Sequence, residues 1–160
     1  MSYADAPLVM SAIPWSIGSQ TFFLGHAKYF GGPVTSRIAG VIHVIPVDME
    51  ARLTGALQLS AHVLRRGKIL CVFPEGNRSR DGKIKEFKKG VGIIAKELNM
   101  PVIPVAIQGT FAMLPRDRSF PRPAKVSISF GKPIHPGTMD YDEIVKRLRE
   151  EVVKMMGDGQ

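Results

Sequence analysis

The side chains best suited to chemistry gather in the polar loop from Pro74 to Glu86 and just beyond it. Six basic and two acidic residues lie between Arg78 and Lys89, and the acid Glu75 precedes them. The basic residues are Arg78, Arg80, Lys83, Lys85, Lys88 and Lys89. Cations beside the start of a helix favour a phosphate or another anion. The loop therefore predicts an anion site, while charge by itself is equally typical of a solvated loop.

The whole chain is basic, with 22 Lys and Arg against 14 Asp and Glu, which gives a net charge of +8. This balance favours nucleic acid, an acidic membrane surface or a phosphorylated substrate as partner, and a generic basic surface is the open alternative. Proteins that stack bases interleave aromatic residues with their cations. Phe87 is the only aromatic residue between Pro74 and Lys89, so we predict no nucleic-acid partner.

The elements that must position this loop alternate along the chain. Apolar or β-branched runs predict strands, at Thr21–Leu24, Gly40–Val47, Lys68–Phe73, Pro101–Ile107 and Lys125–Phe130. Helical periodicity predicts helices, from Leu8 to the first strand, at Glu50–Arg66, at Phe87–Leu98 and from Asp140 onwards. This order predicts an α/β fold with a mostly parallel central sheet flanked by helices. The loop then leaves the carboxyl end of a strand, where open sheets bind ligands.

Single residues refine these elements. Gly67 is expected to end the helix before it, and Asp140 opens the last helix in a capping-box sequence. Pro101 and Pro104 indicate an edge strand or a bulge. Val126, Ile128 and Phe130 alternate and are expected to point inward, and Gly90–Ala95 is expected to pack a helix on the sheet rather than to bind a dinucleotide.

Several classes of protein are excluded by composition. The single cysteine, Cys71, allows no disulfide framework or metal knuckle, and we read it as structural in a buried strand. We find no metal-ligand spacing. No run approaches the roughly 18 apolar residues of a spanning helix, and the first residues lack a basic leader. A cytoplasmic protein, free or at a membrane surface, is expected.

The order Phe-Pro-Glu-Gly-Asn-Arg-Ser at Phe73–Ser79 closely resembles the Phe-Pro-Glu-Gly-Thr-Arg-Ser block of the glycerol-3-phosphate and lysophosphatidate acyltransferase family. Other segments resemble the family's second block, third-block continuation and fourth block: Ala27–Lys28 with Gly40–Asp48, Phe87–Gly90, and Val102–Val105. The resemblance runs from about Ser2 to Ile134. Asn77 replaces the usual threonine, and Met49 stands where the family often has an arginine.

The resemblance implies a reaction and a set of substrate-binding residues. Family members transfer an acyl group from acyl-CoA or acyl carrier protein to a hydroxyl of a glycerol phosphate or lysophospholipid, with no further cofactor and no metal. Arg78 and Lys28 are implied to bind the phosphate, and Ser79 to add a hydroxyl donor. Glu75 is implied to bind the glycerol hydroxyl or to brace the loop, and Gly76 to let the backbone approach substrate closely.

Asp5 matches the aspartate of the family's first block, which reads histidine, four residues, aspartate. In the family the histidine is the general base and the aspartate orients it, so Asp5 is the implied catalytic residue. A helix N-cap is its plain structural alternative. Counting back from Asp5 puts the histidine directly before Met1. The histidines present are expected to be structural or on the surface: His26, His43, His62 and His135.

We therefore predict a single acyltransferase domain over residues 1–160, truncated just after the expected histidine and inactive as numbered. A mis-assigned start, a domain cut from a longer enzyme and a natural non-enzymatic descendant are the explanations that stay open. The alternative function is a non-catalytic phospholipid- or phosphate-binding module. The expected partners are a phosphorylated glycerolipid, an acyl donor, an anionic membrane surface at the cytoplasmic face, and a fused or separate acyl-activating domain.

Overall fold

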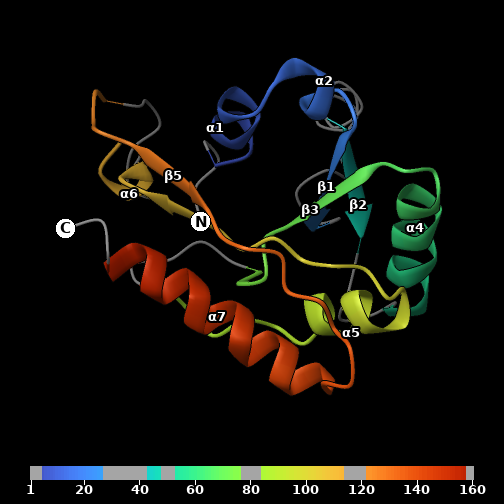
Figure 1. Cartoon of the computed structure of the whole chain (residues 1–160). Coiled ribbons are helices and arrows are strands. Elements are labelled where there is room, and N and C mark those ends of the chain that lie inside the picture. The colour runs from blue at the N-terminus through green and yellow to red at the C-terminus, as the bar shows by residue number, and fades with distance from the viewer. Residues whose placement is uncertain (1–4, 27–42, 48–52, 77–83, 114–121, 158–160) are drawn as a thin grey trace. The chain divides into compact units, whose positions relative to one another are not determined.

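The computed structural model describes residues 5–26, 43–47, 53–76, 84–113 and 122–157 (Figure 1). The chain forms two compact units. The parallel-sheet unit is Ile13–Phe73, and the α7 unit combines Met1–Ala12 with Pro74–Gln160.

The parallel-sheet unit is built on three parallel strands in the order β2-β1-β3. They are β1 (Thr21–His26), β2 (Val44–Val47) and β3 (Ile69–Val72). Phe23 lies in the middle strand, with Val44 and Cys71 as its partners on either side, and it is 2% exposed. The predicted parallel sheet is confirmed. Its β3 strand is less buried than its apolar run suggested, because Ile69 at its start is 44% exposed.

Helix α4 (Leu53–Arg65) is the crossover that joins β2 to β3. It buries Ala56, Ser60 and Val63 and packs against both strands. Gly67 has φ +70°, and the amide of Lys68 donates to the carbonyl of Val63 over 3.3 Å. A left-handed residue with such a bond ends a helix, so the predicted stop at Gly67 is confirmed.

The helix predicted from Leu8 to the first strand is in fact two short helices. They are α1 (Asp5–Ala12), in the α7 unit, and α2 (Trp15–Gly18), in the parallel-sheet unit. Pro14 separates them, because it has no amide hydrogen to continue α1. Its carbonyl instead accepts bonds of 2.9 Å from the amides of Ile17 and Gly18 and so starts α2.

The two later strands do not continue the parallel order. In the α7 unit, β4 (Val105–Gln108) pairs antiparallel with β5 (Ser127–Phe130), and a bridge joins Val102 to Ile134. The short helix α6 (Thr110–Met113) follows β4. Pro104 precedes β4, in keeping with the predicted edge strand. Phe130 does not point inward as expected and is 49% exposed. It is the last residue of β5, and among the described residues only β4 pairs with this strand.

The core of the α7 unit lies between α5 (Gly90–Glu97) and α7 (Tyr141–Gly157), which pack against each other (Figure 1). Its buried members are Val91, Ala95, Ile134, Ile144 and Leu148. A Cβ placed on Gly92 would lie 2.5 Å from the carbonyl oxygen of Tyr141. The small residues predicted in this helix therefore serve close packing, but against α7 rather than on the sheet.

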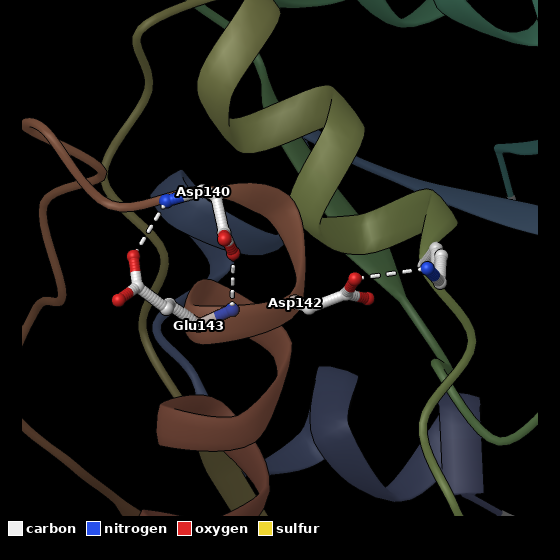
Figure 2. Close-up of polar contacts among 4 residues, drawn as sticks. Asp140, Asp142 and Glu143 are labelled. Atoms are coloured by element: carbon white, nitrogen blue, oxygen red, sulfur yellow. Dashed lines mark hydrogen bonds and ion pairs between the residues drawn. The ribbon is translucent and has the colours of Figure 1, made fainter.

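The predicted capping box opens α7 (Figure 2). The Asp140 carboxylate accepts a bond from the amide of Glu143, and the Glu143 carboxylate accepts one from the amide of Asp140, each over 2.8 Å. Helix α5, by contrast, begins later than predicted, at Gly90. Phe87 to Lys89 are not helical because the amide of Lys88 donates to the carbonyl of Pro74 over 2.8 Å.

Candidate active site

The Pro74–Gly76 turn follows β3 directly along the chain. Phe73, the residue before it, stacks its ring on Phe23 with centroids 6.2 Å apart, within the parallel-sheet unit. Gly76 has φ +70°, a conformation that costs a residue with a β-carbon free energy. A glycine is therefore required by the turn itself. The part of its expected role that concerns substrate approach stays a prediction.

The segment 84–88 returns alongside this turn. The amide of Lys88 donates to the carbonyl of Pro74, and the amide of Lys85 donates to Glu75 Oε2 over 3.4 Å. Glu75 is half-buried. Its carboxylate therefore braces the loop backbone, which is one of its two expected roles, and binding of a glycerol hydroxyl stays a prediction.

The two lysines that follow Phe87 lie in different surroundings. The exposed Lys88 side chain lies over the turn: a Cβ placed on Gly76 would be 2.8 Å from Lys88 Cε and 3.2 Å from Lys88 Nζ. Lys89 instead makes a 2.9 Å ion pair with Asp142 at the start of α7 (Figure 2). The side chain of Lys88 thus lies at the turn, and that of Lys89 lies at the start of α7.

Asp5 is the first residue of α1 and is 3% exposed. Burying an ionised carboxylate is costly unless it is paired or hydrogen-bonded. Orientation of a histidine and capping of α1 both stay predictions for this buried acid.

Three predicted site residues lie outside the described ranges. They are Lys28, Arg78 and Ser79, and the departures from the family pattern at Met49 and Asn77 lie outside as well. Their roles stay predictions.

The histidines differ in their surroundings. His43 is not in mid-strand as expected: it precedes β2 with φ +53°, and its ring stacks on Phe22 with centroids 4.9 Å apart. His43 Nδ1 lies 3.3 Å from the carbonyl oxygen of Thr21. His62 and His135 are exposed, and the side chain of His26 lies outside the described residues. The environment of His43 is that of a structural histidine.

Cys71 is half-buried in β3, and burial raises the pKa of its thiol to about 12. A thiol that stays protonated at neutral pH is a poor nucleophile, which agrees with its predicted structural role. Among the described residues, no group of three or more His, Cys, Asp or Glu is placed to hold a metal ion. No helix within the described ranges has both the length and the apolar character to cross a membrane.

A comparison with protein families matches residues 1–108 to the family described as Acyltransferase. The chain belongs to this acyltransferase family. The matched residues include Asp5, Lys28 and the Phe73–Ser79 block, so the resemblance of that block reflects membership of the family.

Individual relatives agree with this assignment. A 1-acyl-sn-glycerol-3-phosphate acyltransferase of Cocos nucifera is 30% identical over 145 residues, which cover 89% of this chain and 45% of that protein. One from Limnanthes douglasii is 28% identical over 157 residues, with 96% and 54% covered. The chain spans about half the length of the curated relatives it matches.

A solved structure resembles this acyltransferase chain closely. The crystal structure of the 1-acyl-sn-glycerophosphate (LPA) acyltransferase PlsC from Thermotoga maritima superposes with a TM-score of 0.79 and 27% sequence identity. The match covers 98% of this chain and 62% of that one. It confirms the predicted α/β fold class.

Two contacts of the acyltransferase loop escaped the sequence analysis. Lys89 pairs with Asp142, and Arg149 on α7 pairs with Glu86 over 3.4 Å. Both partners stand far along the chain, and local patterns of charge do not link them. The sequence therefore treated all six cations of the loop alike, although the surroundings of Lys88 and Lys89 differ.

Proposed function

We propose that this chain is the domain of a 1-acylglycerol-3-phosphate acyltransferase, and that it is inactive without a histidine directly before Met1. With that histidine it would transfer an acyl group from acyl-CoA or acyl carrier protein to the free hydroxyl of lysophosphatidate or a related glycerol phosphate. The observation that carries this is the family match through the Phe73–Ser79 block together with a buried carboxylate at Asp5. The named activity of the relatives supports the choice of acceptor.

In the proposed mechanism a histidine directly before Met1 is the general base, and Asp5 orients it. The histidine takes the proton of the acceptor hydroxyl while the hydroxyl oxygen attacks the thioester carbonyl carbon. The tetrahedral intermediate then collapses: the C–S bond breaks, the new ester remains, and the histidine returns the proton to the departing thiolate. Atoms and charge balance, and neither a metal nor a redox partner takes part in these steps.

Binding of the acceptor is proposed for the Pro74–Gly76 turn and the loop after it. Arg78 would hold two phosphate oxygens at once, since a guanidinium presents paired donors, and Lys28 and Ser79 would add further donors. Glu75 would position the glycerol hydroxyl while it braces the loop backbone. The left-handed Gly76 would let the acceptor approach the main chain closely.

We propose that residues 1–160 form one acyltransferase domain, which the coverage of the Thermotoga maritima structure supports. An anionic membrane surface is the proposed source of the acceptor, in keeping with the net charge of +8. An acyl-activating domain, fused or separate, is the proposed source of activated acyl groups.

The test compares the chain as numbered with a version extended by a histidine directly before Met1. Release of free thiol from acyl-CoA is measured with and without lysophosphatidate. We expect acceptor-dependent release from the extended version, and a loss of at least about 100-fold on Asp5→Ala, since general base catalysis contributes about 10²–10⁴-fold.

The matched control is Asp142→Asn, which removes another carboxylate near a helix start, one that pairs with Lys89. It should leave thiol release unchanged. An extended chain that releases no thiol with any acceptor contradicts the proposal. If that chain nevertheless binds the phosphorylated acceptor, the alternative of a non-catalytic phosphate-binding module is favoured.

A further inference from the structure

We propose that Phe87 is a positioning residue, whose ring anchors the Pro74–Gly76 turn to the core between α5 and α7. The inference rests on the proposed function, in which this turn binds the acceptor, and it adds a residue that acts through the turn. Three observations within the α7 unit carry it: two bonds from the backbone to the turn, the packing of the ring, and the exposure of the ion pairs beside it.

Two main-chain amides tie the segment of residues 85–89 to the turn. The amide of Lys85 donates to Glu75 Oε2 over 3.4 Å, and the amide of Lys88 donates to the carbonyl of Pro74 over 2.8 Å. Phe87 lies between these two donors in sequence. Because successive residues are joined by rigid peptide units, a shift of Phe87 also moves the groups that hold Pro74 and the Glu75 carboxylate.

The Phe87 ring packs against the core of the α7 unit. Phe87 is the apolar residue of the 85–89 segment, and it is half-buried while Glu86 and Lys88 on either side are exposed. The side chain thus leaves the surface that its neighbours share and fixes the segment to the interior. The core that it contacts draws on both helices: Val91, Ala95, Ile134, Ile144 and Leu148.

Two ion pairs also join the 85–89 segment to α7, but both are exposed. Lys89 pairs with Asp142 over 2.9 Å, and these side chains are 68% and 65% exposed. Arg149 pairs with Glu86 over 3.4 Å, and Glu86 is 88% exposed. Exposed pairs contribute little, because water screens the charges and long side chains lose conformational freedom. Removal of an aromatic ring from water contributes more, so the ring is the principal anchor of the segment.

The anchor brings a distant part of the chain into the function of the turn. Helix α7 lies beyond residues 1–108, which match the acyltransferase family, and its Ile144 and Leu148 belong to the core that holds Phe87. A substrate-binding group that is misplaced by about 1 Å costs up to about 10²-fold in rate. The packing of α7 therefore affects how the turn meets the acceptor. Plain core packing is the competing role for Phe87, and the test separates the two.

The first measurement is amide hydrogen exchange, followed by NMR, in the parent chain, Phe87→Leu and Val145→Ala. Leucine keeps an apolar contact with the core and shortens the anchor. Val145 is the matched control, because it packs against the same core from α7. The amide of Leu148, within α7, reports opening of the core itself.

We expect Phe87→Leu to speed exchange at the Lys88 amide at least about tenfold more than at Leu148, because local opening of the turn then precedes opening of the core. The Lys85 amide should change in the same direction. Val145→Ala should speed exchange at Lys88 no more than at Leu148.

The second measurement is steady-state acyl transfer by the histidine-extended chain with the same substitutions, at a temperature where each variant is folded. We expect Phe87→Leu to lower kcat/KM for lysophosphatidate about tenfold or more. The KM for acyl-CoA should stay unchanged, because the turn is proposed to hold the acceptor. Val145→Ala should keep the kinetics of the parent.

Two results overturn the inference. If exchange at Lys88 rises no more than at Leu148 in Phe87→Leu, the ring belongs to the core without holding the turn. If Phe87→Leu and Val145→Ala lower kcat/KM equally, the loss comes from a general loosening of the core.

Failure of the proposed function gives a different pattern. If no histidine-extended version transfers acyl groups, the catalytic proposal fails, while exchange at the Lys88 amide still decides whether Phe87 holds the turn. If the extended parent chain transfers acyl groups and Phe87→Leu equals it in kcat/KM, the inference fails and the catalytic proposal stands.

Discussion

Gly76 and Gly67 share a backbone conformation, φ +70°, but not their surroundings. A β-carbon on Gly67 would meet nothing within 4 Å, whereas one on Gly76 would meet the Lys88 side chain at 2.8 Å. Alanine substitutions at the two glycines therefore separate the free-energy cost of a left-handed residue from the effect of displacing the Lys88 side chain.

We predict that Gly76→Ala and Gly67→Ala each lower the free energy of unfolding by about 1–2 kcal/mol, the cost of a left-handed conformation for an L-residue. The two losses should be similar, because the end of a lysine side chain moves easily. Urea denaturation measures both. Only Gly76→Ala should also weaken glycerol 3-phosphate binding, and an equal effect of Gly67→Ala on binding would contradict this account.

Cys71 offers a prediction about pH. Burial raises the pKa of its thiol from 9.0 to about 12. In the unfolded chain the thiol loses its proton above pH 9, while in the folded chain it keeps it up to about pH 12. The folded state therefore binds more protons in this window, and stability falls as pH rises through it.

The measurement is the free energy of unfolding between pH 8 and pH 11 for the parent chain and for Cys71→Ala. The parent should lose stability more steeply with pH than the variant, since other titrating groups are common to both. Thiol labelling of the native chain at pH 8 should also be far slower than labelling in denaturant. If the free energy of unfolding fell equally with pH in the parent and in Cys71→Ala, the raised pKa of the Cys71 thiol would be contradicted.

At the scale of elements, the contact between α5 and α7 depends on Gly92. Its built β-carbon lies 2.5 Å from the carbonyl oxygen of Tyr141 and 2.9 Å from Val145 Cγ2. Backbone atoms cannot move aside as a side-chain end can, so the helices must separate to accept any larger residue. Helix α7 carries Asp142 and Arg149, and the loop before α5 is tied to it through them.

We predict that Gly92→Ala destabilises the chain by about 1–3 kcal/mol, the usual cost of overpacking, although alanine is the better helix former by about 1 kcal/mol. Gly157→Ala is the matched control, because Gly157 closes α7 with nothing within 4 Å of its built β-carbon. It should be neutral or stabilising in thermal unfolding. A destabilisation no larger than that of the control would show that the contact tolerates a methyl group.

Sequence patterns predicted elements well where the signal is local. The capping box at Asp140 and the stop at Gly67 were expected from neighbouring residues, and the parallel sheet was expected from the alternation of strands with helices. The antiparallel pairing of β4 with β5 was not predicted, because alternation along a strand does not say which strand it pairs with. Helix α5 was predicted to begin at Phe87, because the bond from Lys88 to Pro74 that keeps this segment out of the helix is not local.

The net charge of +8 and an exposed tryptophan of the parallel-sheet unit support the proposed contact with an anionic membrane surface. Trp15 is 83% exposed and Ile17 42% exposed, both on α2. The amide of Ile69 donates to the carbonyl of Gln20, which joins the residues after α2 to the start of β3. The residues just before β3 therefore come at the same end of this sheet as the residues after α2, and three of them are cations: Arg65, Arg66 and Lys68. An exposed tryptophan and basic residues in one unit would suit the surface of an anionic bilayer.

We predict that vesicles containing an anionic phospholipid shift the emission of Trp15 to the blue, since it is the only tryptophan of the chain. Neutral vesicles should have little effect, and added salt should weaken the shift because it screens the charges. Trp15→Ala should reduce vesicle binding in a sedimentation assay. Binding with unchanged Trp15 emission would place the membrane contact elsewhere.

The sequence by itself determined the family, the α/β class and the candidate residues around the Phe73–Ser79 block, because these depend on the order of residues along short segments. It could not say which of two adjacent lysines lies at the turn. Tertiary structure decided this. Lys89 pairs with Asp142 on α7, 53 positions away in sequence, while the amide of Lys88 donates to the Pro74 carbonyl and its side chain lies over Gly76. Contacts between distant segments depend on how whole elements pack, so a pattern of neighbouring residues does not predict them.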